Sequence, residues 1–203
     1  AAGLVTQLRN TRTLIDIARY GTNLYSRLEK ETGYHIGFNQ TGSITVAKTQ
    51  GRLAELRKIA SLGKSYGIDI EEISVQKAGQ MWPGLYTEDL KGAIHIPKDG
   101  QTIPAKTALA MARVAEDNGA QIFENIKVLD IETTNNSVSG IITDQGTVKC
   151  EYIVNAAGMW AREVGLMCGV NIPLYGAEHM YLVTNKINIS KDMKSLRVPD
   201  DQI

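Results

Sequence analysis

The sequence predicts an α+β fold, in which helices and strands alternate early in the chain and several strands follow one another later. Apolar residues recur at three- and four-residue steps in several segments, which is typical of amphipathic helices. Two short segments alternate apolar with polar residues, as half-buried strands do. Between residues 121 and 154, short apolar runs are separated by turn residues, which predicts a β-meander followed by one buried strand.

The first helix and the first strand have clear local signals. Residues 13–31 carry an apolar stripe at helical spacing, and Gly33 is expected to end this helix because glycine readily adopts the left-handed conformation there. Residues 42–48 (GSITVAK) alternate Ile44 and Val46 with polar neighbours, which predicts a half-buried strand. A sheet therefore begins at this strand.

Two helices are expected next. Apolar positions between residues 53 and 60 mark an amphipathic helix, which Gly63 or Gly67 is expected to end. Ser74 is a suitable N-cap for a short third helix, because its hydroxyl can accept a hydrogen bond from a free backbone N–H. The Pro83–Gly84 pair must end that helix.

A second strand and a longer helix follow. Residues 92–97 (GAIHIP) predict the strand. Pro104 is expected in the first turn of a helix that runs to Asn118, with Gly119 at its end. The small side chains on one face of this helix are expected to let it approach a sheet closely. That face consists of Ala105, Ala108, Leu109, Ala112 and Ala115.

The last part of the chain holds the segment with the most distinctive composition. Residues 152–160 (YIVNAAGMW) predict a buried strand that opens into a helix over 161–168, and residues 179–184 predict a returning strand. Ala156, Ala157 and Gly158 leave the main chain bare at the strand end, where free N–H groups could contact a flat or anionic ligand. On these residues alone, close packing of strand on helix without a ligand is the favoured interpretation.

The composition limits the function classes. The 203 residues include 22 Lys plus Arg and 22 Asp plus Glu, so the formal net charge is zero. Neither nucleic acid nor an anionic membrane surface is therefore an expected partner. No segment approaches the roughly 18 consecutive apolar residues that a membrane span needs. We expect a soluble protein of the cytoplasm, with the mitochondrial matrix as the alternative.

Several catalytic motifs are absent from the sequence. It has no GxSxG elbow and no P-loop, so nucleophilic hydrolysis and phosphoryl transfer are not indicated. Cys150 and Cys168 lack ligand spacing and are expected to be buried, reduced thiols, and the three histidines also lack it, so no metal site is expected. No two glycines are separated by a single residue, so the GxGxxG dinucleotide motif is missing as well.

Two of the histidines have a definite place in the pattern. His95 alternates with Ile94 and Ile96, so it is expected to be a surface or packing residue. His179 stands at the head of a predicted strand, where it is a candidate general base or substrate contact. An ordinary hydrogen-bonded histidine is the default interpretation of His179.

Five segments together resemble a known family. They are AAGLVTQLR at 1–9, YSRLEKETG at 25–33, GFNQTGSITVA at 37–47, VNAAGMWAREVG at 154–165 and EHMYLVT at 178–184. In this order they resemble the FAD-dependent dimethylglycine and sarcosine dehydrogenases of the glycine oxidase and D-amino-acid oxidase superfamily. The resemblance covers nearly the whole chain.

The resemblance implies an internal fragment of a flavoenzyme that oxidises dimethylglycine or sarcosine at the N-methyl carbon. An α/β portion of the FAD domain, over 1–34 and 99–168, would be interleaved with part of an antiparallel-sheet substrate domain, over 35–98 and 169–203. In relatives the GxGxxG loop and a histidine that carries covalent flavin lie upstream, so the isolated chain is not expected to bind FAD tightly. An electron-transfer flavoprotein and folate are implied as possible partners.

The resemblance also assigns site residues, position by position. Ala1, Ala2, Gly3 and Leu4 resemble the loop that lies against the flavin, and Val128 resembles the residue whose backbone meets the adenine ring. The strand-end contacts are expected at Ala157, Gly158 and Trp160, and His179 is expected to position the amine. Ile103 departs from the pattern, because many relatives have an acidic residue before the proline that Pro104 matches.

Two alternatives stay open. One is a glycine-oxidase-like enzyme, and the other is a non-catalytic folded module, such as a regulatory or partner-binding remnant of a split flavoenzyme. A GxGxxG motif upstream in the gene, with a histidine directly before Ala1, would favour the enzyme.

Overall fold

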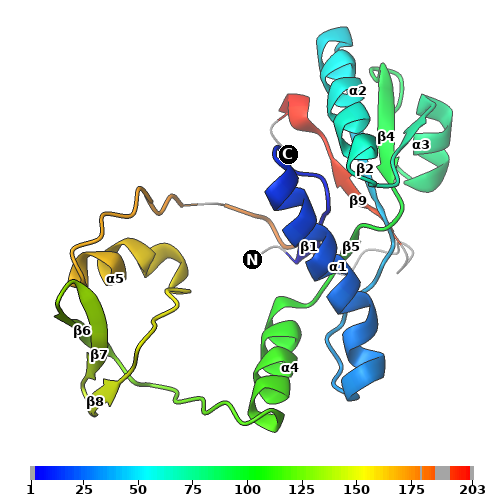
Figure 1. The fold of residues 1–203 in the computed structure, drawn as a ribbon. Helices are drawn as coiled ribbons and strands as arrows, with labels where there is room; N and C mark the ends of the chain where they lie inside the picture. Colours follow the sequence, from blue (N-terminus) through cyan, green and yellow to red (C-terminus); the bar gives the residue numbers. More distant parts are fainter. Residues whose placement is uncertain (1–2, 179, 186–192, 202–203) are drawn as a thin grey trace. The chain divides into compact units, whose positions relative to one another are not determined.

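The computed structural model describes residues 3–178, 180–185 and 193–201, and the chain divides into two compact units (Figure 1). Unit 1 comprises Ala1–Ala120 and Ile187–Ile203, and unit 2 comprises Gln121–Lys186. Helices together with parallel and antiparallel strand pairs confirm the predicted α+β class. The division into FAD-binding and substrate-binding parts is a statement about ligands and stays a prediction.

A four-stranded sheet forms the centre of unit 1. Its strands, in spatial order, are β3 (Glu71–Ile73), β4 (Gly92–Ile96), β2 (Ser43–Ala47) and β9 (Ser195–Arg197). β4 runs antiparallel to β2 with Ile44 opposite His95, and β9 runs parallel to β2 with Leu196 opposite Ile44. The strands predicted over 42–48 and 92–97 are confirmed, whereas β3 and β9 were not predicted.

Both faces of this sheet are buried, so β2 is not half-buried as predicted. On one face α2 (Gln50–Ser65) contributes Leu53, Leu56 and Ala60 to a core with Ile94 and Ile96. On the other face α3 (Val75–Met81) contributes Ala78 to a core that contains these strand residues: Ile44, Val46, Ile73 and Ala93. A strand covered on both sides carries apolar residues at successive positions, because neither face meets water.

The helices begin and end at the signals that the sequence carries. α1 (Arg12–Thr32) ends at Gly33, whose φ is 76°, and its N–H donates to the Glu29 carbonyl. α2 runs through Gly63, and the left-handed Gly67 follows its last turn. The Ser74 hydroxyl accepts from the Lys77 N–H at 3.1 Å, as expected for the N-cap of α3.

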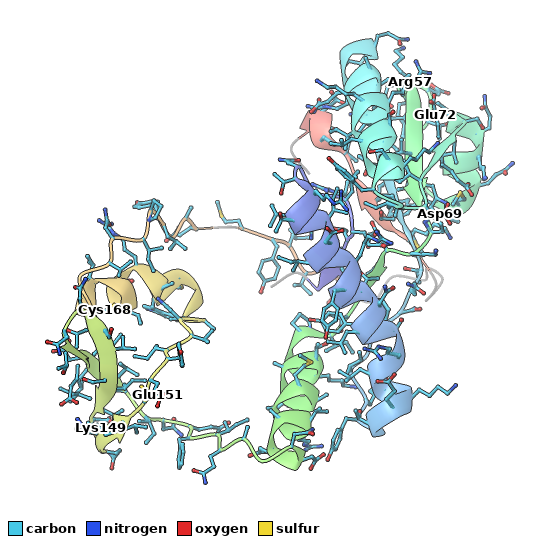
Figure 2. The ribbon with its side chains drawn as sticks, viewed as in Figure 1. Arg57, Asp69, Glu72, Lys149, Glu151 and Cys168 are labelled. Carbon is cyan, nitrogen blue, oxygen red and sulfur yellow. The ribbon has the colours of Figure 1, made fainter. Side chains whose placement is uncertain are left out.

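An ion pair ties α2 to the edge of the sheet. Arg57 of α2 and Glu72 of β3 point toward each other (Figure 2), with Arg57 Nε 3.0 Å and Nη2 2.6 Å from Glu72 Oε1. The Arg57 guanidinium lowers the pKa of the Glu72 carboxyl. Both side chains are about half exposed, so the pair contributes little to stability and mainly orients the two groups.

The helix α4 (Pro104–Asp117) has the predicted bounds but buries a different face. Pro104 occupies its first turn, and Gly119 follows it with φ 88°. Thr107 and Ala110 are its buried residues, and Ala110 packs with Leu28 of α1. The predicted face includes the exposed Leu109, and the core that α4 joins contains Leu28 of α1. The spacing of small residues along a helix does not specify which element packs against it. In this structure α4 packs against α1.

Unit 2 contains the predicted meander. Its strands are β6 (Val128–Thr134), β7 (Ser137–Thr143) and β8 (Gly146–Lys149), paired antiparallel in this order. Asn135 and Asn136 form the first turn with φ values of 51° and 64°, which is the conformation that tight hairpins require. A single 3₁₀ turn, η1 (Gly158–Trp160), leads into α5 (Ala161–Met167), as the predicted helix over 161–168 requires.

Three predicted strand segments are wrong. Residues 152–157 are not in a strand, and Tyr152 and Val154 are 87% and 89% exposed. Residues 180–184 are likewise exposed without a strand, and residues 121–123 form none. An apolar run is buried as a strand only where neighbouring strands pair with it, and the β6–β8 ladder does not include these segments.

Two further observations concern the described residues only. None of their helices combines the length and the apolar character that crossing a membrane would require. No group of three or more His, Cys, Asp or Glu side chains among them could hold a metal ion.

Candidate functional site

A hollow in unit 1 is the best candidate site. Its volume is about 400 Å³, and its walls come from the chain start, α1 and the beginning of α4. Concave apolar sites with a few polar groups are typical of cofactor and small-ligand binding. The lining residues are Gly3, Leu4, Val5, Tyr25, Thr102, Pro104, Thr107, Ala108 and Met111.

The chain start enters this hollow through a short ladder. β1 (Leu4–Val5) pairs antiparallel with β5 (Gly100–Gln101), and the Thr102 N–H donates to the Gly3 carbonyl at 2.8 Å. Gly3 has φ 75°, and a Cβ atom at this position would overlap the Thr102 carbonyl oxygen. Only glycine fits there, because both the backbone conformation and the close approach exclude a side chain.

Two threonine hydroxyls hold the segment that leads into α4. The Oγ1 atoms of Thr102 and Thr107 each lie 3.1 Å from the Ile36 carbonyl oxygen and also contact each other, so the two hydroxyls share hydrogen bonds with this acceptor. Thr107 is buried, so its hydroxyl needs these partners. The Tyr25 ring packs on Phe38 with a centroid distance of 6.1 Å. These contacts hold the beginning of α4 at the hollow.

A second candidate surface lies in unit 2, at the turn before α5. Asn155 shapes this turn: its Oδ1 accepts from the Ala157 N–H at 3.2 Å and its Nδ2 donates to the Ala161 carbonyl at 2.8 Å. Gly158 has φ 57°, and no atom lies within 4 Å of the place where its Cβ would be. The bare main chain at Gly158 is therefore accessible, and Trp160 beside it is 64% exposed.

The structure brings together some of the predicted site residues. Gly3 and Leu4 line one hollow in unit 1. Ala157, Gly158 and Trp160 share one turn in unit 2, and Val128 is the first residue of β6 in the same unit. Their roles as cofactor contacts stay predictions. Ala1, Ala2 and His179 lie outside the described residues.

Sequence reasoning missed most of the lining of the hollow. Tyr25 lies in α1 and Met111 lies in α4, while Thr102 follows β5. These residues carry no common motif, because only the packing of α4 on α1 brings them to one place. The one local signal was Pro104, which marks the beginning of α4 and itself lines the hollow.

The chain is similar to known proteins along its whole length. The model of the DAO family, described as FAD dependent oxidoreductase, matches residues 1–202. The mitochondrial pyruvate dehydrogenase phosphatase regulatory subunit of Mus musculus is 40% identical over 185 residues, which are 90% of this chain and 21% of that protein. Mitochondrial sarcosine dehydrogenase of Mus musculus is 35% identical over 208 residues, covering 100% of this chain and 23% of that protein.

The comparison with solved structures agrees. Glycine oxidase from Geobacillus kaustophilus matches with a TM-score of 0.73 and 28% identity, covering 86% of this chain and 49% of that one. The resemblance drawn from the five sequence segments is thus confirmed. The chain spans 21% and 23% of the lengths of the two curated relatives.

Proposed function

The chain belongs to the DAO family of FAD-dependent oxidoreductases, and from this premise we propose that the complete protein uses FAD to oxidise an amine. The proposed substrate is an N-methylated glycine, either dimethylglycine or sarcosine, oxidised at its N-methyl carbon. Mouse sarcosine dehydrogenase, which matches the whole of this chain, supports this substrate class.

One observation of the structure carries the proposal. Gly3 and Leu4, in the loop expected to lie against the flavin, line an apolar hollow, and Gly3 is fixed there against Thr102. A concave apolar hollow with a few polar groups is the kind of site that binds cofactors and small ligands. This arrangement supports a flavin contact at Gly3 and Leu4.

The residues of this chain fit only part of an FAD molecule. Gly3 and Leu4 would contact the flavin ring, and the backbone of Val128 would meet the adenine ring. Further cofactor contacts are proposed for Ala157, Gly158 and Trp160, which lie in the turn before α5. The pyrophosphate needs a glycine-rich loop before a helix, and the sequence holds no GxGxxG motif. We therefore propose that this chain contributes ring and adenine contacts, and that its affinity for FAD in isolation is weak.

The chemistry divides between cofactor and protein. FAD, when bound, supplies the acceptor for the hydride equivalent that leaves the N-methyl carbon. The apolar walls of the hollow would restrict the orientation of a bound molecule. An amine releases hydride readily only when it is unprotonated, so His179 is proposed to favour the neutral amine or to accept its proton.

Two further parts of the proposal concern partners and compartment. An electron-transfer flavoprotein is proposed as electron acceptor, and folate as acceptor of the released one-carbon unit. The cytoplasm and the mitochondrial matrix are both proposed compartments, and the two mouse relatives are named as mitochondrial proteins.

The test uses the complete gene product. We expect it to show flavin absorbance after purification, or after addition of FAD, and to lose that absorbance under anaerobic sarcosine or dimethylglycine. Absence of bound flavin in both preparations would contradict the proposal. For the isolated 203-residue chain we expect no tight binding, and a calorimetric titration that gave submicromolar affinity for FAD would contradict this part.

A second candidate function has its own support. The mouse pyruvate dehydrogenase phosphatase regulatory subunit is 40% identical to this chain, against 35% for sarcosine dehydrogenase. A regulatory module without catalysis is therefore the alternative proposal. It predicts that no methylated amine reduces the flavin of the complete gene product, whether or not flavin binds, and that the protein co-purifies with a partner enzyme.

A further inference from the structure

Unit 1 buries one carboxyl group that the proposed function does not use. Asp99 is 1% exposed and lies in the turn between β4 and β5. Removing a carboxylate from water is costly unless hydrogen bonds replace its solvation. Burial raises the pKa of Asp99 above its ordinary value of 3.8, while hydrogen bonds from Ser43 and Gln7 act in the opposite direction.

The Asp99 carboxyl group joins two distant segments. Its Oδ1 accepts from the Gln7 backbone N–H at 2.9 Å and from Gln7 Nε2 at 3.4 Å, and its Oδ2 accepts from Ser43 Oγ at 2.6 Å. The Asp99 carbonyl also accepts from the Gly42 N–H at 2.8 Å. The same residue thus holds the segment after β1 and the beginning of β2.

The hydrogen bonds of Asp99 lie at one end of the β1–β5 ladder, and this ladder holds Leu4 of the candidate site. β1 and β5 pair over two residues only, with Leu4 opposite Gln101 and Val5 opposite Gly100. So short a ladder has little stability of its own. Asp99 directly precedes β5 and Gln7 lies just beyond β1, so their hydrogen bonds lengthen the connection at the Val5 end.

We propose that Asp99 is a positioning residue, which sets the place of Gly3 and Leu4 at the hollow by holding Gln7 against the turn before β5. The inference rests on the proposed function, in which this loop lies against the flavin. Asp99 itself is not among the residues that line the hollow, so it acts through β1. Loss of its carboxyl group should loosen the loop without removing any wall of the hollow.

Three variants of the complete gene product separate positioning from general stabilisation. Asp99→Ala removes the side-chain hydrogen bonds to Gln7 and to Ser43. Asp99→Asn keeps the shape, because its amide oxygen can still accept from the Gln7 N–H while its NH₂ group donates to Ser43. Ser43→Ala is the matched control, because it removes the hydrogen bond from Ser43 in β2 to Asp99 and leaves the hydrogen bonds from Gln7 in place.

The first measurement is amide hydrogen exchange, with α2 as the internal reference for general loss of stability. In Asp99→Ala we expect exchange of residues 3–7 to accelerate about tenfold more than exchange of α2. Asp99→Asn and Ser43→Ala should leave the ratio of the two rates within about twofold of wild type. Equal acceleration of both segments in Asp99→Ala would show a purely stabilising role and overturn the inference.

The second measurement is the visible circular dichroism of the bound flavin, which depends on the surroundings of the ring. Asp99→Ala should change this spectrum, and Asp99→Asn and Ser43→Ala should retain it. A wild-type protein that takes up no flavin would contradict the proposed function. A flavin-containing wild type whose spectrum is unchanged in a folded Asp99→Ala variant would overturn the Asp99 inference alone. If Asp99→Ala does not fold, Asp99→Leu is measured in its place under the same two criteria.

Discussion

Gly3 lies directly against Thr102, with its carbonyl oxygen 2.8 Å from the Thr102 nitrogen and with no room for a Cβ atom beside the Thr102 carbonyl. Their hydrogen bond joins the start of the chain to the segment that leads into α4, which begins just after Ile103. The position of the loop at the hollow therefore depends on glycine at residue 3. It can be tested without any ligand.

We expect Gly3→Ala to lower the free energy of unfolding of unit 1 by about 2–3 kcal/mol, from left-handed backbone strain together with overlap on Thr102. Gly33→Ala is a matched control, because Gly33 has nearly the same φ, 76°, but open space around its Cβ position. Strain alone should cost Gly33→Ala about 1 kcal/mol. Urea denaturation followed by Trp82 fluorescence, in a Trp160→Phe background, measures both losses, and equal losses would refute the overlap.

Ile103 gives a prediction of the opposite sign. It is the N-cap residue of α4 and provides no side-chain hydrogen bond to the first turn. Ile103→Asp should raise the free energy of unfolding by about 1 kcal/mol, because a carboxylate accepts from a free N–H and interacts favourably with the helix dipole.

Ile103→Ala is the control for the side chain that is lost. The Ile103 side chain packs over Gly37, and Ala removes this contact without supplying an acceptor. The Ala variant should be less stable than wild type by urea denaturation. If the Asp variant is no more stable than the Ala variant, α4 gains nothing from a cap at this position.

His179 is tested by kinetics in the complete gene product. If it favours the neutral amine or accepts its proton, His179→Ala should slow flavin reduction by roughly 10²-fold or more, as expected for loss of general acid–base assistance. Anaerobic stopped-flow absorbance during a single turnover measures this rate directly. His35→Ala serves as the control, because the exposed His35 is paired with Glu29 on the surface. A rate equal to that of wild type would remove His179 from the mechanism.

The helices were predictable from sequence because their ends depend on local chemistry. Ser74 caps α3, Pro104 begins α4 and Gly33 ends α1, and each effect needs only a few neighbouring residues. The meander was predictable for the same reason, since Asn135 and Asn136 specify its first turn.

The errors concern pairing, which a local pattern does not specify. Residues 152–157 have the apolar run of a buried strand, yet no strand of unit 2 pairs with them among the residues described. β9 is short and has no distinctive pattern, and it joins the sheet because Leu196 packs on the core beside α3. The lining of the hollow was not predictable for the same reason, because Tyr25 and Met111 come together only when α1 and α4 pack.

His95 of β4 shows what burial does to a polar residue that sequence reasoning assigned to the surface or to packing. It is 8% exposed, and neither ring nitrogen has a hydrogen-bond partner among the residues that the structure describes. Glu71 Oε2 is 3.8 Å from Nδ1, and Lys77 and Lys194 are the nearby positive charges. Burial lowers the pKa of His95 below its ordinary value of 6.5, while the Glu71 carboxylate raises it.

The sign of the pH dependence follows from this shift. A neutral His95 is favoured in the folded state, so its contribution to stability is present above pH 6.5 and is lost as the pH falls below 6.5 toward the pKa of the folded state. We expect wild type to lose stability relative to His95→Leu between pH 7.5 and pH 5, because leucine does not titrate. Glu71→Gln should increase the loss, since it removes the carboxylate that favours protonated His95. Urea denaturation at several pH values measures these differences, and parallel pH profiles for wild type and His95→Leu would show that His95 does not control the acid sensitivity of unit 1.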